Sequence, residues 1–313
     1  MCADTARTPC LVLALAAAGS VFLASAVPSA QEPAEVSLSV VEPAGPLQPG
    51  GVGLVVVSAS MELSALAGEA FGRPVRFWRG ASPTEWRGLV GVDLGVAPGS
   101  HALSLIGPGT NGGMAEARHV LRVEPKRFET RRLRVAPDLV KPPPEQAARI
   151  EREAKAMADS FAVVSPERLW RGRFDAPVPG VATSSYGRLT LMNGEAAGRH
   201  QGADFRASTG TTVRAPNAGS VVLAQELYFA GNTVILDHGL GVFSLVAHLS
   251  RIDVAVGGRV SRGDQLGASG ATGRVTGPHL HWAVRFNDAS VDPQSLMQAV
   301  AGLADEGDAR TTQ

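Results

Sequence analysis

Short runs in which hydrophobic and polar residues alternate fill the first part of the chain. Val36, Leu38 and Val40 alternate with serines, which is the period of a strand with one buried face. Turn residues such as those at 49–51 separate the runs, and a spacing of roughly 8–12 residues between strands is typical of a β-sandwich. We therefore predict an immunoglobulin-like β-sandwich over 33–136. Its seven or so strands are expected at 36–40, 54–57, 75–78, 89–94, 101–106, 119–123 and 130–135.

A helical pattern follows in the segment 137–173. Three prolines at 142–144 stiffen the chain, and Pro144 suits the first position of a helix. The apolar residues then repeat at intervals of three and four, which predicts an amphipathic helix. They are Ala147, Ile150, Ala154, Met157 and Phe161. The pattern favours a helical connector packed on one of its neighbouring domains, and the alternative is a spacer that positions or occludes a functional site.

From 174 to 297 the pattern is again that of short strands. Largely apolar runs such as 234–236 and 242–246 alternate with glycine-containing turns. Two segments, 210–221 and 256–267, each show a strand, a glycine-bearing turn and a second strand. A barrel-like stack of β-sheet is therefore expected, which makes the whole chain mainly β, with residues 298–313 as a flexible tail.

The first thirty residues have the pattern of an export signal. Arg7 precedes an almost wholly apolar run over 11–23, and Ala24-Ser25-Ala26 matches a cleavage site. The apolar run is shorter than the roughly 20 residues of a membrane span. We predict a signal peptide over 1–30 and an exported protein, in the periplasm or in the extracellular space and cell wall. The alternative is an uncleaved N-terminal anchor, which would be the only attachment to a membrane.

Composition narrows the possible partners and the kinds of metal site. Lys and Arg together number 29, and so do Asp and Glu. The chain therefore lacks the surplus of basic residues that a protein needs to bind nucleic acid as its main partner. Cys2 and Cys10 both lie in the predicted signal. The mature chain would then hold neither a disulfide nor a cysteine–zinc site.

The candidate chemistry lies between positions 200 and 281. His279 and His281 flank one residue, so on a strand their imidazoles point to the same side. His200 and Asp204 lie four apart around a glycine that permits a turn, and His248 ends an apolar run. A single histidine is more often an ordinary packed or surface residue, but this set indicates a metal site. Two imidazoles, one carboxylate and an open fourth position are typical of catalytic zinc.

The other three histidines carry no such indication. His238 lies in a turn-like segment and is interpreted as structural. His101 and His119 lie in the predicted sandwich and receive no role.

The segment 174–297 resembles the LytM/lysostaphin-type zinc metallopeptidases, which are peptidoglycan endopeptidases. The resemblance rests on His200-x-Gly202-x-Asp204, on 231–239, on Ala247-His248-Leu249-Ser250 and on Thr276-Gly277-Pro278-His279-Leu280-His281, in the family's order. It implies an antiparallel β fold and one Zn²⁺ per chain, held by His200, Asp204 and His281. It also implies that His248 and His279 are the catalytic pair.

One position departs from the family's pattern, and two further residues are weaker candidates. Where members often carry an aromatic residue two before the catalytic histidine, this chain has Val246. Tyr186, which precedes a glycine as in the segment that opens the family's domain, and Asn232 are candidates for substrate binding.

The sequence thus predicts an exported zinc metalloendopeptidase that hydrolyses peptide cross-links of bacterial peptidoglycan. The alternative is a non-catalytic regulator of the same fold that activates another cell-wall hydrolase, although such relatives typically lose zinc ligands. A biotinyl- or lipoyl-type carrier is excluded because no lysine follows Lys155. The absence of an H-E-x-x-H motif excludes a zincin mechanism. Diaminopimelate-type cross-links and glycine bridges both remain open as substrates.

Overall fold

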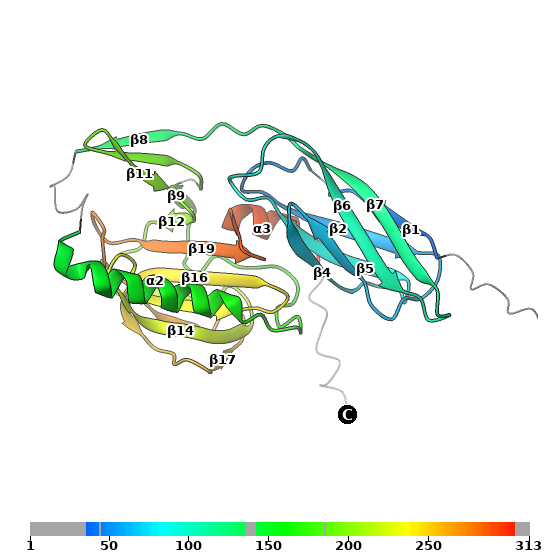
Figure 1. Ribbon diagram of the computed structural model, residues 1–313. Coiled ribbons are helices and arrows are strands. Elements are labelled where there is room, and N and C mark those ends of the chain that lie inside the picture. The colour runs from blue at the N-terminus through cyan, green and yellow to red at the C-terminus, as the bar shows by residue number, and fades with distance from the viewer. Residues whose placement is uncertain (1–35, 44, 135–141, 185, 304–313) are drawn as a thin grey trace, which may run out of the picture. The chain divides into compact units, whose positions relative to one another are not determined.

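β-Strands make up most of the regular structure, as the sequence predicts (Figure 1). The predicted export signal lies outside the described residues, all of which belong to one compact unit that begins at Ala34. Among the residues that the structure describes, no helix has the length and apolar character needed to cross a membrane. The computed structural model describes residues 36–43, 45–134, 142–184 and 186–303.

The first region is a seven-stranded antiparallel sheet in the order β1-β2-β5-β4-β3-β6-β7. Single parallel bridges join Val36 to Ala115 and Leu47 to Val123, so the segments on either side of β1 also pair with β7 and the sheet closes in a barrel-like manner. Apolar residues of the alternating runs fill its core, which fits the predicted sandwich. The strands are β1 Leu38–Val41, β2 Val52–Ala59, β3 Ala67–Ala70, β4 Arg73–Arg79, β5 Glu85–Gly91, β6 Gly99–Pro108 and β7 Met114–Val123.

Within the segment predicted as the sandwich, two strands differ from the sequence-based expectation. β3 was not expected because its sequence, Ala-Gly-Glu-Ala, has no β-branched or aromatic residue, and its pairing with β4 and β6 supplies what propensity does not. The run predicted as the last strand of the sandwich forms β8 (Thr130–Leu133). It pairs in parallel with β10 (Leu189–Met192), which is followed by β11 (Glu195–Arg199) in a separate three-stranded sheet. Local alternation predicts a strand but does not identify its partner.

The predicted helix is present as α2 (Ala147–Ala162), preceded by a 3-10 turn, η1 (Pro144–Gln146). Phe161 is 7% exposed and meets Phe243 edge to face, with ring centroids 5.4 Å apart. Its other buried neighbours are Leu223 and Ile235 of the second β region. Figure 1 shows α2 running along β16 (Val242–Ile252) and β14 (Gly219–Leu227). The helix therefore packs on this sheet through its apolar stripe.

The second region is a ten-stranded sheet whose main path is β17-β14-β15-β16-β19-β12-β9. β18 pairs with β13 and β16, β20 pairs with β19, and all pairings of this sheet among the described residues are antiparallel. The strands are β9 Ala182–Ser184, β12 Ala203–Phe205, β13 Thr212–Arg214, β14 Gly219–Leu227, β15 Gly231–Asp237, β16 Val242–Ile252, β17 Arg259–Val260, β18 Gln265–Ser269, β19 Leu280–Phe286 and β20 Ala289–Val291. A short helix, α3 (Pro293–Ala299), follows and is capped by the Asp292 side chain.

The hydrophobic core continues from the first region into the second. Trp78 of β4 meets Trp170 edge to face at 5.2 Å, and both belong to the cluster that includes Phe286. The amide of Val52 donates to Ser295 Oγ at 2.8 Å. The predicted domain boundaries remain a prediction, because the two β regions share this core.

Candidate metal centre

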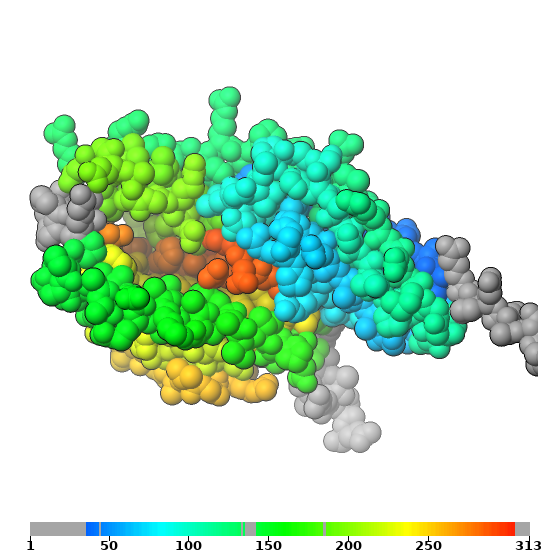
Figure 2. All heavy atoms as spheres, viewed as in Figure 1, coloured from blue at the N-terminus to red at the C-terminus, as the bar shows by residue number. Residues whose placement is uncertain are grey.

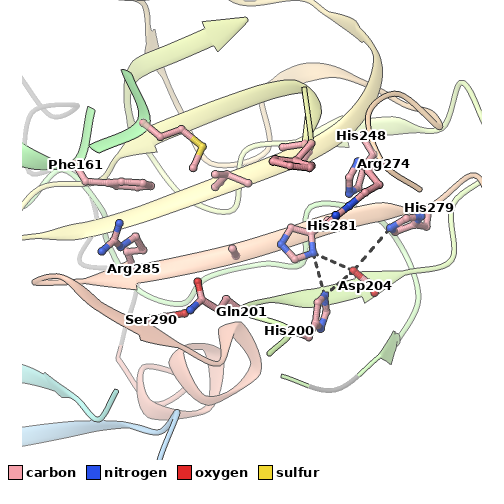
Figure 3. A pocket seen from close by; sticks show the side chains of 16 residues that line it. Phe161, His200, Gln201, Asp204, His248, Arg274, His279, His281, Arg285 and Ser290 are labelled. Carbon is pink, nitrogen blue, oxygen red and sulfur yellow. Dashed lines mark hydrogen bonds and ion pairs between the residues drawn. The ribbon is translucent and has the colours of Figure 1, made fainter. Parts of the chain in front are cut away.

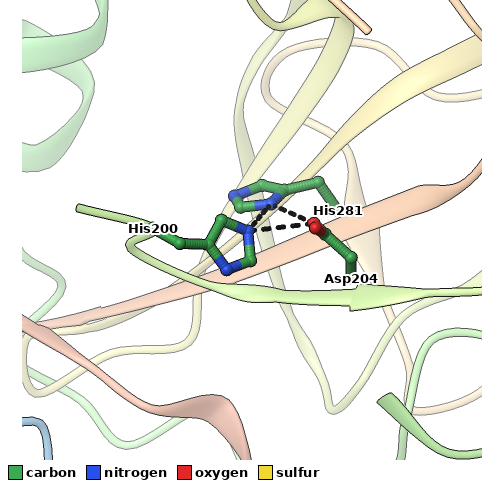
Figure 4. Close-up of side chains that lie close together, drawn as sticks. All are labelled: His200, Asp204 and His281. Carbon is green, nitrogen blue, oxygen red and sulfur yellow. Dashed lines mark hydrogen bonds and ion pairs between the residues drawn. The ribbon is translucent and has the colours of Figure 1, made fainter. Parts of the chain in front are cut away.

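Strand pairing brings the predicted ligands together. Asp204 of β12 and His281 of β19 are direct cross-strand partners. Leu280 and Trp282, the neighbours of His281, point to the opposite face and are fully buried, which anchors the strand. His200 lies just before β12, and its side chain reaches the same side of the sheet (Figure 4).

Three potential ligand atoms converge at this point (Figure 4). His200 Nε2 lies 3.0 Å from Asp204 Oδ1 and 3.1 Å from His281 Nδ1, and the last two atoms are 2.9 Å apart. Around a tetrahedral zinc with bonds of about 2.0–2.1 Å, ligand atoms stand roughly 3.3 Å from one another. The geometry and the chemistry of the three donors therefore fit a zinc ion. Within the described ranges no other group of three such side chains converges in this way.

The electrostatics of the cluster also suit a cation. Burial alone would raise the pKa of the Asp204 carboxyl, but hydrogen bonds and charge interactions with His200 and His281 hold that pKa well below its usual range. Burial lowers the pKa of His281, against the opposing effect of Asp204. An ionised carboxylate and a neutral imidazole are the forms in which these groups bind metal.

Gly202 is needed for space rather than for a turn. Its φ lies outside the left-handed region, so the conformational freedom expected from the sequence is not used. A Cβ at this position would lie 2.6 Å from His281 Cε1 and 2.6 Å from the carbonyl oxygen of Trp282. The backbone before β12 thus passes directly beside a ligand imidazole.

We expect Gly202→Ala to weaken zinc binding by at least about tenfold, because the new methyl group displaces the His281 ring, and a loss of about 1.4 kcal/mol already produces that factor. Zinc affinity measured by competition with a chromogenic chelator tests this. The control is Gly277→Ala, since a Cβ there meets no atom within 4 Å. Equal zinc affinity in both variants would contradict the steric role of Gly202.

His248 and His279 form a second pair beside the three ligands. Their ring centroids are 4.8 Å apart, and His279 Nε2 lies 3.9 Å from Asp204 Oδ1. The Nδ1–H of His248 donates to Thr272 O, and that of His279 donates to Gly277 O, both at 2.9 Å. Since a carbonyl only accepts, these bonds select the tautomer whose Nε2 carries a lone pair. Burial lowers the pKa of His248 to about 4, so this ring is neutral at neutral pH.

A β-bulge directs His248. Asn232 pairs with Leu249 and Val234 pairs with Val246, so β16 has one residue more than β15 between these pairs. His248 lies in this bulge with φ of 63°, in the left-handed region. The sequence showed only that an apolar run ends here, and it did not predict this conformation.

Asn232 belongs to the support of this bulge. Its side-chain amide donates to Leu249 O at 3.0 Å, and its backbone amide donates to Thr272 Oγ1 at 2.9 Å. Thr272 in turn donates to Leu249 O. Asn232 is not among the residues that line the cavity, and its predicted role in substrate binding stays a prediction.

Tyr186 and His238 lie in the interior of the fold. Tyr186 is 3% exposed, donates its hydroxyl proton to Ser290 O at 2.5 Å and is likewise absent from the cavity lining, so its substrate role also stays a prediction. Burial raises the pKa of this hydroxyl. His238 is fully buried between Ala218 O and Ser244 Oγ, at 2.7 and 2.9 Å, as expected for a structural histidine.

A cavity of about 430 Å³ opens over the three candidate metal ligands and the pair of His248 and His279 (Figure 3). Figure 2 shows a hollow with β19 in orange at its base and α2 in green along one side. Met157 and Phe161 of α2 line it, so the connector helix both packs on the sheet and forms a wall of the site. The sequence did not single out three other lining residues: Phe229, Arg274 and Arg285.

Comparisons with known proteins agree with this geometry. The model of peptidase family M23 matches residues 198–293, which include all five residues of the cluster and the histidine pair. A candidate M23 peptidase from Pseudomonas aeruginosa, known from a crystal structure, is 34% identical in sequence to this chain. The two structures align with a TM-score of 0.63, and the match covers 82% of this chain and 96% of that one.

Two curated relatives match less than a third of this chain. Peptidoglycan DD-endopeptidase ShyA of Vibrio cholerae is 47% identical over 83 residues, which are 26% of this chain and 19% of that protein. DD-carboxypeptidase/endopeptidase Mpg of Neisseria meningitidis is 42% identical over 97 residues, which are 31% of this chain and 22% of that protein. The chain therefore matches about a fifth of the length of each.

Proposed function

Because the chain belongs to peptidase family M23, we propose that it is an exported zinc metalloendopeptidase that hydrolyses peptide cross-links of bacterial peptidoglycan. The observation that carries the proposal is the convergence of His200 Nε2, Asp204 Oδ1 and His281 Nδ1 beside two further histidines in a cavity. The name of ShyA, a peptidoglycan DD-endopeptidase, supports peptidoglycan as the substrate. The proposal of export rests on the sequence pattern over 1–30 and implies a location in the periplasm or in the extracellular space and cell wall.

The chain's own residues divide the work of hydrolysis between them. His200, Asp204 and His281 would hold the metal, and a zinc ion in such a site supplies Lewis acidity that polarises a peptide carbonyl and activates water near neutral pH. His248 and His279 each have a lone pair on Nε2, because the proton on Nδ1 is donated to a backbone carbonyl. One of them can accept the proton of the attacking water and pass it to the leaving amine.

A non-catalytic regulator of the same fold remains the alternative reading of the sequence. Such a protein has no need of a complete ligand set or of a matched histidine pair. Here all five side chains are present, and the three ligand atoms lie within 3.1 Å of one another, which favours the peptidase.

Digestion of purified peptidoglycan by the full chain tests the proposal. We expect cross-linked muropeptide dimers to be converted to monomers, as followed by mass analysis. A chelator should stop this conversion and added zinc should restore it. Asp204→Ala serves as the inactive control. Persistence of the dimers with zinc-loaded protein, or cleavage that a chelator leaves untouched, would count against a zinc peptidase.

A further inference from the structure

Two arginines line the cavity on different sides of the ligand cluster (Figure 3). Arg274 lies beside His248, and Arg285, on β19, lies beside Phe161. Each guanidinium is held over an aromatic ring: Arg274 over Phe229 at 4.5 Å and Arg285 over Phe161 at 4.6 Å. Stacking involves the face of a guanidinium, and its N–H donors lie around the edge in the planar fork geometry that matches a carboxylate.

Apart from one carboxylate, the charged side chains that line the cavity are cationic. Among the described residues that line it, Asp204 is the only carboxylate, and Asp204 is already engaged with two histidines. Arg285 meets Asp288 only at long range, with 3.9 Å between Nη2 and Oδ1 and 3.5 Å between Nη2 and the carbonyl oxygen. The Arg285 side chain is 38% exposed, so it remains within reach of a ligand. The cavity therefore presents two cationic groups to whatever binds over the ligand cluster.

The backbone fixes where both arginines stand. The amide of Arg274 donates to Phe229 O at 2.8 Å, which ties the loop before β19 to the turn before β15. Arg285 is the strand partner of Phe243 in β16 and of Ser290 in β20, four residues beyond His281 on the same strand. Same-face residues recur every second position along a strand, so Arg285 and His281 point to one side. Arg285 thus lies on the same strand as His281, and Arg274 lies in the loop that leads into that strand.

We propose that Arg274 and Arg285 are specificity-determining residues that bind carboxylates of the peptide on the two sides of the scissile amide. The proposal rests on the function proposed above and names its substrate class. Cross-links through diaminopimelate carry free carboxylates close to the bond that joins the two stems, whereas a glycine bridge carries none. A glycine bridge has no carboxylate that the two arginines could bind. The cavity therefore selects cross-links that carry carboxylates.

Four matched cross-linked peptides test the assignment. One has free carboxylates on both sides of the scissile amide, two have a carboxamide on one side or the other, and the fourth is amidated on both. Binding is measured by calorimetry with zinc-loaded His279→Ala protein, in which turnover does not disturb the equilibrium. Cleavage of the same peptides is measured separately with the unsubstituted chain.

We expect each amidation to weaken binding by about tenfold or more, the usual effect of losing a hydrogen bond between charged groups. Added to the His279→Ala background, Arg274→Gln should remove the effect of amidation on one side only, and Arg285→Gln should remove it on the other side only. Arg274→Lys and Arg285→Lys should keep part of the preference. Arg259→Gln, an exposed arginine of β17 outside the cavity, should keep both preferences.

Equal binding of all four peptides by the parent would overturn the proposal. So would arginine variants that weaken every peptide by the same factor, because that pattern indicates loss of packing rather than of carboxylate recognition. Failure of the proposed function gives a different result: the peptides bind with the expected preference, but the unsubstituted chain cleaves none of them.

Discussion

Replacing His281 by alanine should abolish both zinc binding and hydrolysis. Nδ1 of His281 lies 2.9 Å from the Asp204 carboxylate and 3.1 Å from His200 Nε2. Its removal leaves one imidazole and one carboxylate, and two protein ligands do not make a catalytic zinc site, which takes three. We expect zinc content to fall from one per chain to near zero after dialysis, as measured by atomic emission, and release of cross-linked peptides to become undetectable.

Thermal unfolding supplies a second measurement for the same variant. A ligand that binds only the folded state stabilises it by about 2.7 kcal/mol at a concentration of 100 times its Kd. Zinc should therefore raise the Tm of the unsubstituted chain and leave that of His281→Ala almost unchanged. His101→Ala is the matched control, because His101 lies in β6 and is not among the residues that line the cavity. Zinc retained at full stoichiometry in His281→Ala would refute the ligand role.

The sequence predicts that His279 and His281 face the same side because strand periodicity is a short-range rule. Two histidines separated by one residue share a face of a strand wherever that strand lies. The rule says nothing of which strands are neighbours, so the direct pairing of Asp204 with His281 could be expected only from the family resemblance. The same limit explains β8, where the strand was predicted correctly but its partner was not.

Features that depend on close approach between distant segments stayed out of reach. The need for Gly202 comes from the ring of His281, which is 79 positions further along the chain. Arg274 and Arg285 are unremarkable in the sequence, and only the fold places both beside the ligands. Each of these features follows from three-dimensional contacts, for which hydrophobic periodicity carries no information.

His248 was predicted from the sequence only in part. Its motif was recognised in the sequence, whereas the bulge that turns it toward the cavity was not. A non-glycine residue at φ of 63° costs about 1–2 kcal/mol, and the surrounding hydrogen bonds from Asn232 and Thr272 to Leu249 O hold the backbone there. Strain of this kind is concentrated at functional sites, where it fixes the direction of a side chain.

His248→Ala should leave zinc bound and lower turnover by about 10²- to 10⁴-fold, the usual contribution of general acid–base catalysis. Zinc should stay because His248 contributes no atom to the converging donor set and its ring centroid lies 6.0 Å from that of His281. The lost group is the Nε2 lone pair that the bond from Nδ1 to Thr272 O leaves facing the cavity. Turnover on cross-linked muropeptides and zinc content, measured on one preparation, test both halves of the prediction.

His248→Gly separates the imidazole from the backbone that carries it. Glycine adopts φ of 63° without strain, so this variant should be as stable as His248→Ala or more stable, while it lacks the same ring. If the ring accepts and donates the proton, the two variants should lose turnover by the same factor despite their different stabilities. Near-normal turnover in either variant would remove His248 from the mechanism. Recovery in the glycine variant alone would show that the bulge, rather than the imidazole, is what hydrolysis requires.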